Sequence, residues 1–194
     1  MEALFENKTY SKTDFTQSLL DKGDYENCIF EHCNFLHSDF SKTKFIDCTF
    51  TACNLSMIQL GDSVFRDCRF TECKMLGLHF EDCNEYGLSI LLSNCVLNHS
   101  SFYQTKMKGV RFNGCQLEEV DFTLCDLTQA SFANCDLLNA KFENTMLEKT
   151  DFRTARNYSI NPAMNKIRKA RFSLPEVLAL LDHYDIQVEG FNSD

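Results

Sequence analysis

The sequence contains no tryptophan, only two prolines and only seven glycines among its 194 residues. So little proline and glycine argues against long flexible linkers, and the length fits a single domain. No stretch approaches the roughly 18 apolar residues of a membrane-spanning helix. The first residues are polar and acidic, unlike the basic and apolar start of a signal peptide. We therefore expect a cytoplasmic protein with no membrane segment.

Basic residues are also in the minority. The chain has 19 Lys and Arg against 28 Asp and Glu, a net charge of −9. Direct binding to nucleic acid is therefore disfavoured, because phosphates attract cationic surfaces. A partner protein with a basic surface is the natural alternative. The cysteine count of eleven is odd, which argues against a disulfide framework.

Recognisable catalytic motifs are missing as well. The chain has no P-loop, no G-x-S-x-G turn and no Ser, His and Asp constellation. Its cysteines recur five residues apart, which does not match the spacing of zinc sites, so we interpret them as small buried residues. These absences predict a protein that is not an enzyme and holds no metal or cofactor. An enzyme that uses a loop near Glu85 and Tyr86 is a weaker alternative.

What the chain does have is a five-residue period. A large apolar residue stands at every fifth position from Phe15 to Phe80 and again from Leu97 to Phe152. Sixteen of the eighteen phenylalanines fall in these series or at Phe5, which precedes them in phase. A smaller residue usually stands two positions earlier, as Cys28 stands before Phe30. Neither an α-helix nor a flat strand has this period, so both residue types must face one core of a repeating coil.

The cysteines point to a coil of about 20 residues. Cys28, Cys48 and Cys68 are spaced by 20, and so are Cys95, Cys115 and Cys135. Stacking such coils places identical aromatic residues above one another. We predict three phenylalanine ladders, namely Phe30–Phe50–Phe70, Phe102–Phe122–Phe142 and Phe112–Phe132–Phe152.

The pattern divides the chain into segments. Residues 1–10 form an N-terminal cap, residues 11–153 form the repeat body, and residues 154–194 form a C-terminal helical cap. The phase breaks over residues 84–94, where it shifts by two. This break is either a kink that adjusts the stacking or a projecting contact loop, since loops on rigid scaffolds often carry function.

The C-terminal segment differs in composition from the repeats. Pro175 after Ser173 and Leu174 indicates a helix start. A β-solenoid needs a cover over its last coil, and this helix can supply it. Apolar residues that remain on it could pair with a second copy of the chain. The predicted homodimer interface consists of Leu174, Val177, Leu178, Leu181, Ile186 and Val188.

Acidic residues recur at one repeat position in the second half of the chain. Asp121, Asp126, Asp136 and Asp151 each precede a large inward residue. With Glu85 and Tyr86, they are the predicted partner-binding residues. About seven coils spaced by about 4.8 Å give a rod of roughly 34 Å, close to ten base pairs of DNA. The acidity is either an ordinary soluble surface or an imitation of DNA that attracts a basic saddle.

The small–x–large–x–x motif over residues 11–153 resembles the pentapeptide-repeat family. This resemblance implies an all-β solenoid, a right-handed quadrilateral β-helix with four pentapeptides per coil. Three segments are more specific, because they resemble the albicidin-resistance and microcin-immunity members. They are Cys73–Gly77, Cys95–Tyr103 and the tail around Asn157–Tyr158 and Ile167–Glu176.

Those members act on DNA gyrase, and their group is described as DNA-mimicking dimers joined at their C-termini. The resemblance therefore implies a DNA mimic that binds DNA gyrase or a related type II topoisomerase and provides antibiotic resistance or toxin immunity. The sequence lacks the two long projecting loops of quinolone-resistance members. The alternative is a generic protein-interaction scaffold of the same family with no topoisomerase role.

Overall fold

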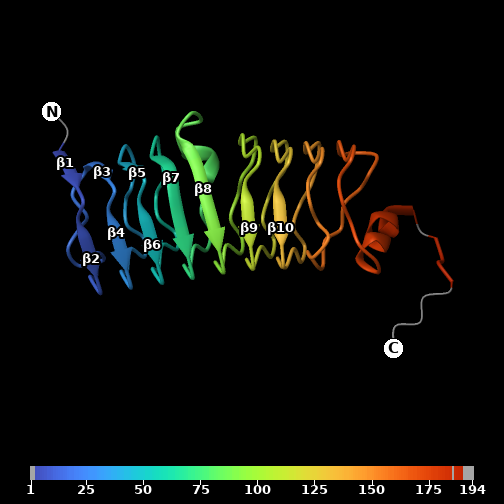
Figure 1. Ribbon diagram of the computed structural model, residues 1–194, viewed down its shortest axis with the longest axis horizontal. Helices are drawn as coiled ribbons and strands as arrows, with labels where there is room; N and C mark the ends of the chain where they lie inside the picture. Colours follow the sequence, from blue (N-terminus) through green and yellow to red (C-terminus); the bar gives the residue numbers. More distant parts are fainter. Residues whose placement is uncertain (1–2, 185, 190–194) are drawn as a thin grey trace.

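The computed structural model describes residues 3–184 and 186–189. The chain forms a right-handed, four-sided β-solenoid whose coils stack along one axis, with the two ends of the chain at opposite ends of the rod (Figure 1). Its short strands are β1 (Ala3–Glu6), β2 (Thr9–Ser11), β3 (Gly23–Glu26), β4 (Ile29–Glu31), β5 (Lys44–Ile46), β6 (Thr49–Thr51), β7 (Val64–Thr71), β8 (Leu88–Ser93), β9 (Arg111–Asn113) and β10 (Ser131–Ala133). Two 3₁₀ helices, η1 (Phe80–Asp82) and η2 (Glu176–Tyr184), complete the described elements.

Neighbouring coils pair in parallel, with partners 20 residues apart. Tyr25 lies opposite Phe45, and Phe112 lies opposite Phe132. Isolated bridges keep the same spacing outside the strands, as between Asp126 and Met146. The 20-residue coil that the cysteine spacing predicts is therefore confirmed.

The core consists of stacked layers, as the repeat predicts. Phe30 and Phe50 stack with their ring centroids 4.7 Å apart, and the Phe112–Phe132 and Phe132–Phe152 pairs each stack at 5.0 Å. Phe102 and Phe122 stack at 5.4 Å. All three predicted ladders are present, and their rings are stacked along the axis of the solenoid.

A left-handed residue turns most of the corners. In the regular coils, the residue just before the small inward residue has a φ of about +50° to +63°, as at Asn27, His32 and Asn139. Only a minority of residue types adopt this conformation readily, and Asn is one of them. Asparagine accordingly recurs here, at Asn7, Asn27, Asn94, Asn134, Asn139, Asn144 and Asn157.

The solenoid continues beyond the sequence repeat. Phe172 stacks on Phe152 at 5.4 Å, and the bridge series reaches Arg171 opposite Asp151. Ala155 and Ile160 are buried in the phase of the small inward residues, and Tyr158 is buried although it does not keep the five-residue phase. The predicted boundary at 153/154 therefore marks the end of the sequence pattern and not the end of the coils. At the other end, β1 pairs with β3 and β2 pairs with β4, so the predicted cap of residues 1–10, extended by Ser11, already forms a first coil.

The C-terminal cover is the 3₁₀ helix η2, which begins close to the predicted start. Ala179 and Leu180 of this helix pack against the core. Val177, Leu178 and Leu181, which are three of the predicted dimer residues, lie on the same helix and are half-buried. The helix is a 3₁₀ helix, with three residues per turn rather than the 3.6 of an α-helix.

Candidate partner-binding surfaces

The four predicted partner-binding aspartates do not share one face of the rod. Asp121 bridges Lys141, Asp126 bridges Met146, Asp136 bridges Arg156, and Asp151 bridges Arg171. Residues 20 apart lie on one wall, whereas residues five apart lie on adjacent walls. The four positions therefore fall on four different sides of the solenoid, so together they do not form a continuous acidic surface.

Each of these carboxylates also caps its own turn. Asp121 accepts a hydrogen bond from the amide of Thr123 at 2.8 Å, and Asp126 accepts one from Thr128 at 2.9 Å. The amides of Leu138 and Arg153 donate to Asp136 and Asp151 at 3.3 and 3.1 Å. Such side-chain bonds to the backbone two residues on are typical of Asp at turns. The recurrence of Asp at this repeat position thus has a structural cause.

Two of the four are further neutralised by arginine. Asp151 contacts both Arg153 at 2.8 Å and Arg171 at 2.7 Å. Asp136 contacts Arg156 at 3.1 Å. The hydrogen bond from Arg153 and the nearby guanidinium charges lower the pKa of Asp151, and Asn157 and Arg156 lower the pKa of Asp136 against the opposing effect of burial. Within the described residues, Asp121 and Asp126 have no such ion pair.

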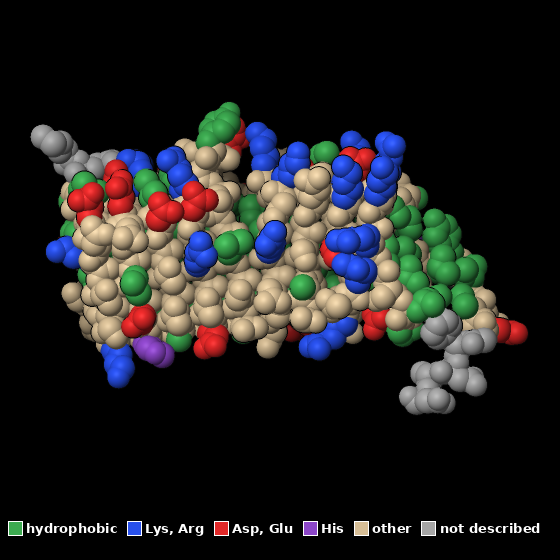
Figure 2. Space-filling model, viewed as in Figure 1, with side chains coloured by type: hydrophobic (Ala, Val, Ile, Leu, Met, Phe, Trp, Pro, Cys, Tyr) green, Lys and Arg blue, Asp and Glu red, His purple; other side chains and the backbone are tan. Residues whose placement is uncertain are grey.

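A different acidic row follows the N-terminal half of the rod. Glu6 lies opposite Glu26 in the β1–β3 pair. Asp47 and Asp67 come one position later in the next two coils, and both line the same surface hollow. Figure 2 shows acidic side chains following one another along this half of the molecule. We call Glu6, Glu26, Asp47 and Asp67 the acidic row. Sequence reasoning missed it, although writing the sequence in lines of 20 puts Glu6 and Glu26 in one column and Asp47 and Asp67 in the next.

The insertion at the phase break is shorter than predicted. Strand β8 starts at Leu88 and pairs with β7 on one side and β9 on the other, so residues 88–93 belong to the wall. The pairing shifts by one residue between Phe65–Leu88 and Cys68–Ile90, and beyond it the partners are 22 residues apart, as at Phe70 and Leu92. The predicted break over 84–94 is therefore confined to a loop of residues 84–87.

Both predicted contact residues of this loop are exposed. Tyr86 is 84% exposed, and the Asn84 side chain accepts a hydrogen bond from its amide at 3.2 Å. Glu85 lies 3.6 Å from the ammonium group of Lys106, which also stands 5.6 Å from the centre of the Tyr86 ring. Hydrogen bonding to Tyr86, followed by the charge of Lys106, lowers the pKa of Glu85. The loop thus exposes an aromatic ring and a carboxylate, and the contacts with Lys106 link it to the next coil.

The predicted dimer residues fall into two groups. Leu174, Ile186 and Val188 are 65%, 57% and 49% exposed, whereas Val177, Leu178 and Leu181 are half-buried on η2. Figure 2 shows a broad hydrophobic surface at the C-terminal end of the rod. Apolar patches of this kind are common at interfaces.

The cysteines lie inside the solenoid, as their repeat position predicts. All eleven are free and buried. Burial raises the pKa of Cys125, on the inner wall, and of Cys83, beside the loop, to about 12 in each case. A thiol that stays protonated is a poor nucleophile. No cluster of His, Cys, Asp and Glu suited to a metal ion occurs among the residues described.

The repeat, the 20-residue coil and the inward ladders match a known family model. The model for the pentapeptide repeat region matches residues 23–90 and 88–152, which is more than half of the chain. The chain belongs to the pentapeptide-repeat family. Its surface, rather than its repeat, must distinguish it from other pentapeptide-repeat proteins, because a shared fold does not imply a shared function.

Solved structures of pentapeptide-repeat proteins have the same fold. QnrB1, a plasmid-mediated fluoroquinolone resistance protein, aligns with a TM-score of 0.52 and 15% identity, covering 95% of this chain and 100% of that one. HetL, involved in heterocyst differentiation regulation in the cyanobacterium Nostoc, aligns with a TM-score of 0.59 and 13% identity, covering 88% of this chain and 87% of that one. At these identities the likeness concerns the fold alone.

Two further findings complete the comparison. No curated protein sequence matches the chain. None of the helices in residues 3–184 and 186–189 is long and apolar enough to cross a membrane.

Proposed function

We propose that this pentapeptide-repeat protein is a DNA mimic that binds DNA gyrase or a related type II topoisomerase and protects it from a toxin or antibiotic. The acidic row is the observation that carries the proposal. Glu6, Glu26, Asp47 and Asp67 repeat once per coil on a rod whose net charge is −9. A basic DNA-binding saddle attracts such a surface over long range.

The charge distribution limits the mimicry to the N-terminal half. The C-terminal coils carry Arg153, Arg156 and Arg171, which neutralise Asp136 and Asp151. The proposed contact surface is therefore the acidic row together with the loop residues Glu85 and Tyr86. Asp121 contributes charge from another wall, whereas Asp126 lies farther along the wall that carries Glu26.

The same proposal includes a homodimer joined at the C-termini. Leu174, Ile186 and Val188 expose apolar surface beyond the last coil. Pairing two copies there would lengthen the rod and place the two acidic rows at its outer ends. The protein itself would act by binding, without catalysis and without a cofactor.

The proposal is tested by DNA supercoiling with purified gyrase, with and without albicidin. We expect the wild-type protein to restore supercoiling or reduce cleavage complexes in the presence of the drug. Replacing Glu26, Asp47 and Asp67 by their amides should weaken this protection at least about tenfold, since each lost charge contact is worth roughly 0.5–1 kcal/mol. Amide replacement of Asp121, which lies on another wall, is the control.

Inhibition of gyrase without protection from the drug would support gyrase as the partner but would contradict the proposed role in resistance. Equal loss of activity in the test and control variants would show that total charge matters and the row does not. No effect on gyrase at micromolar protein would overturn the proposal.

A generic interaction scaffold is the second candidate. HetL, which is involved in heterocyst differentiation regulation, aligns with a TM-score of 0.59, compared with 0.52 for QnrB1. The fold thus serves more than one kind of process. A specific partner recovered from bacterial lysate without any gyrase subunit would favour this alternative.

A further inference from the structure

One wall of the solenoid is interrupted between two consecutive coils. On this wall β7 pairs with β8 at Leu88, and Lys106 bridges Asp126 one coil later. On this wall, no bridge joins the coil of Leu88 to that of Lys106 within residues 3–184. The adjacent walls keep their pairing, through His79 and Ser101 on one side and β8–β9 on the other. Figure 1 shows the wider spacing that follows β8.

The interruption leaves backbone groups without partners. In the regular coils, the residue after the small inward residue donates its amide to the preceding coil, as Asp126 donates to the carbonyl of Thr105 at 2.9 Å. Lys106 occupies the same position, but its amide makes no protein hydrogen bond in the described chain. The carbonyl oxygens of Lys106 and Lys108 likewise lack a donor there. These groups form a short strand edge, which is the usual template for pairing with another chain.

Two hollows lie along this edge. One of about 520 Å³ is lined by β8 and by residues 106–110, and a second of about 340 Å³ lies under the loop of residues 84–87. They meet at Leu88 and Lys106, which line both. Volumes of this size are typical of ligand sites. Met107 and Val110 contribute apolar surface from the coil on the far side.

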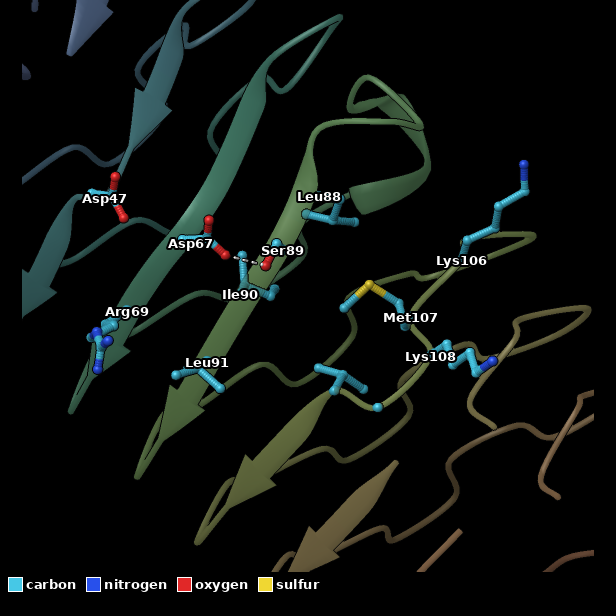
Figure 3. Close-up of a pocket in the computed structure, with 12 residues that line it drawn as sticks. Asp47, Asp67, Arg69, Leu88, Ser89, Ile90, Leu91, Lys106, Met107 and Lys108 are labelled. Carbon is cyan, nitrogen blue, oxygen red and sulfur yellow. Dashed lines mark hydrogen bonds between the residues drawn. The ribbon is translucent and has the colours of Figure 1, made fainter. Parts of the chain in front are cut away.

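The charges around the larger hollow favour an acidic occupant. Arg69 lies on the β7 side and Lys108 on the opposite side, as Figure 3 shows. Neither cation takes part in an ion pair within the described residues. Asp47 and Asp67 lie on the β7 side with Arg69, and Asp67 accepts a hydrogen bond from Ser89 at 2.9 Å. The edge coil contributes Lys106 and Lys108 to the hollow and no carboxylate. Two unpaired cations on an acidic protein point to a carboxylate on the ligand.

We propose that this gap, the wall slot, binds an extended segment of a partner protein that pairs with the backbone of Lys106–Lys108 and places an acidic side chain between Arg69 and Lys108. Adding a strand to an exposed edge is a common mode of peptide recognition, in which main-chain bonds supply affinity and alternate side chains supply specificity. The slot uses residues outside the acidic row except at Asp47 and Asp67, which line its rim. Its occupancy does not depend on gyrase being the partner.

The probe is a short, end-blocked peptide of alternating threonine and valine with one central glutamate, labelled with fluorescein. Binding to the full-length protein is followed by anisotropy, beside a peptide with central lysine and one with alternate amides methylated. We expect the glutamate peptide to bind about tenfold more tightly than the lysine peptide, because hydrogen bonds to charged groups are the stronger ones. Methylation should abolish binding, and hydrogen exchange should slow only over residues 105–109.

Lys108→Glu should reverse the preference between the two peptides, whereas Lys141→Glu, an exposed control on another wall, should leave it unchanged. Equal binding of both peptides, or no binding at about 1 mM, overturns the proposal. Displacement of the glutamate peptide by millimolar acetate would show that the slot binds only the carboxylate group and would contradict strand pairing. Protection of residues 105–109 by self-association, without peptide, would assign the slot to a second copy and also contradict the proposal.

Discussion

At the residue scale, each position of the pentapeptide has its own structural role. The large residue fills the core, the small residue fits the corner, and the residue before it adopts the left-handed conformation. Aspartate before the large residue caps the turn through its carboxylate, as Asp121 does for Thr123. Frequent acidic residues in this family pattern can therefore reflect turn chemistry rather than partner binding, and each carboxylate has to be examined for its own contacts.

Asp151 provides a prediction about pH. Its pKa in the folded protein lies below the ordinary value, with the hydrogen bond from Arg153 as the largest cause. A carboxyl with a depressed folded pKa contributes stability above its unfolded pKa of about 4, and this contribution is lost as pH falls through the folded pKa. Asp151→Asn should therefore cost up to about 1 kcal/mol at pH 7, because the carboxylate is partly exposed to solvent.

Chemical denaturation of the wild type and Asp151→Asn at several pH values measures this effect. The difference between them should shrink steadily below pH 4 or so. Asp47→Asn, at an exposed position without an ion pair among the described residues, serves as control. A difference that stays constant down to pH 2 or so would mean that the amide disturbs packing and that the charge is not the cause.

At the element scale, each coil depends on the coil before and after it. A short strand such as β10 has no hydrophobic core of its own and gains one only from the rings above and below it. Phe132 illustrates this dependence, since it stacks on Phe112 and Phe152 at 5.0 Å each and is completely buried. Phe5, in the first coil, stacks only on Tyr25 in the described chain, at 4.6 Å, and remains partly exposed.

Truncating these two rings should have unequal effects. We expect Phe132→Ala to destabilise the protein by about 3–5 kcal/mol, because it leaves a cavity within a closed stack. Phe5→Ala should cost only about 1–2 kcal/mol, because part of that ring is already in water. Urea denaturation followed by circular dichroism gives both values. Equal losses would indicate that the first coil is as tightly packed as the middle of the rod.

At the scale of the whole molecule, the rod has two different ends and two different halves. The N-terminal half carries the acidic row, and the C-terminal coils carry arginines paired with aspartates. The cover of the last coil, η2, turns Ala179 and Leu180 inward and leaves Leu174 exposed. The asymmetry favours a dimer that joins the apolar ends and leaves the acidic rows outermost.

The dimer is tested by light scattering on the variant Leu174→Asp combined with Ile186→Asp. Both positions are more than half exposed, so the charges should not disturb the cover of the last coil. We expect a soluble monomer with an unchanged circular dichroism spectrum. The contrasting variant is Leu180→Asp. It changes a residue that packs against the core, and it should destabilise the packing of η2 on the last coil. A dimer that survives the double change would place the interface elsewhere.

The period, the inward residues and the 20-residue coil can be predicted from the amino-acid sequence, because core packing repeats locally and each pentapeptide carries its own pattern. It also located the C-terminal cover at Pro175 and the insertion near Glu85, since both interrupt that pattern. The surfaces of the rod could not be predicted in this way. The neutralisation of Asp151, the acidic row and the wall slot at Lys106 all depend on side chains or backbone groups about 20 residues apart, which meet only when consecutive coils stack.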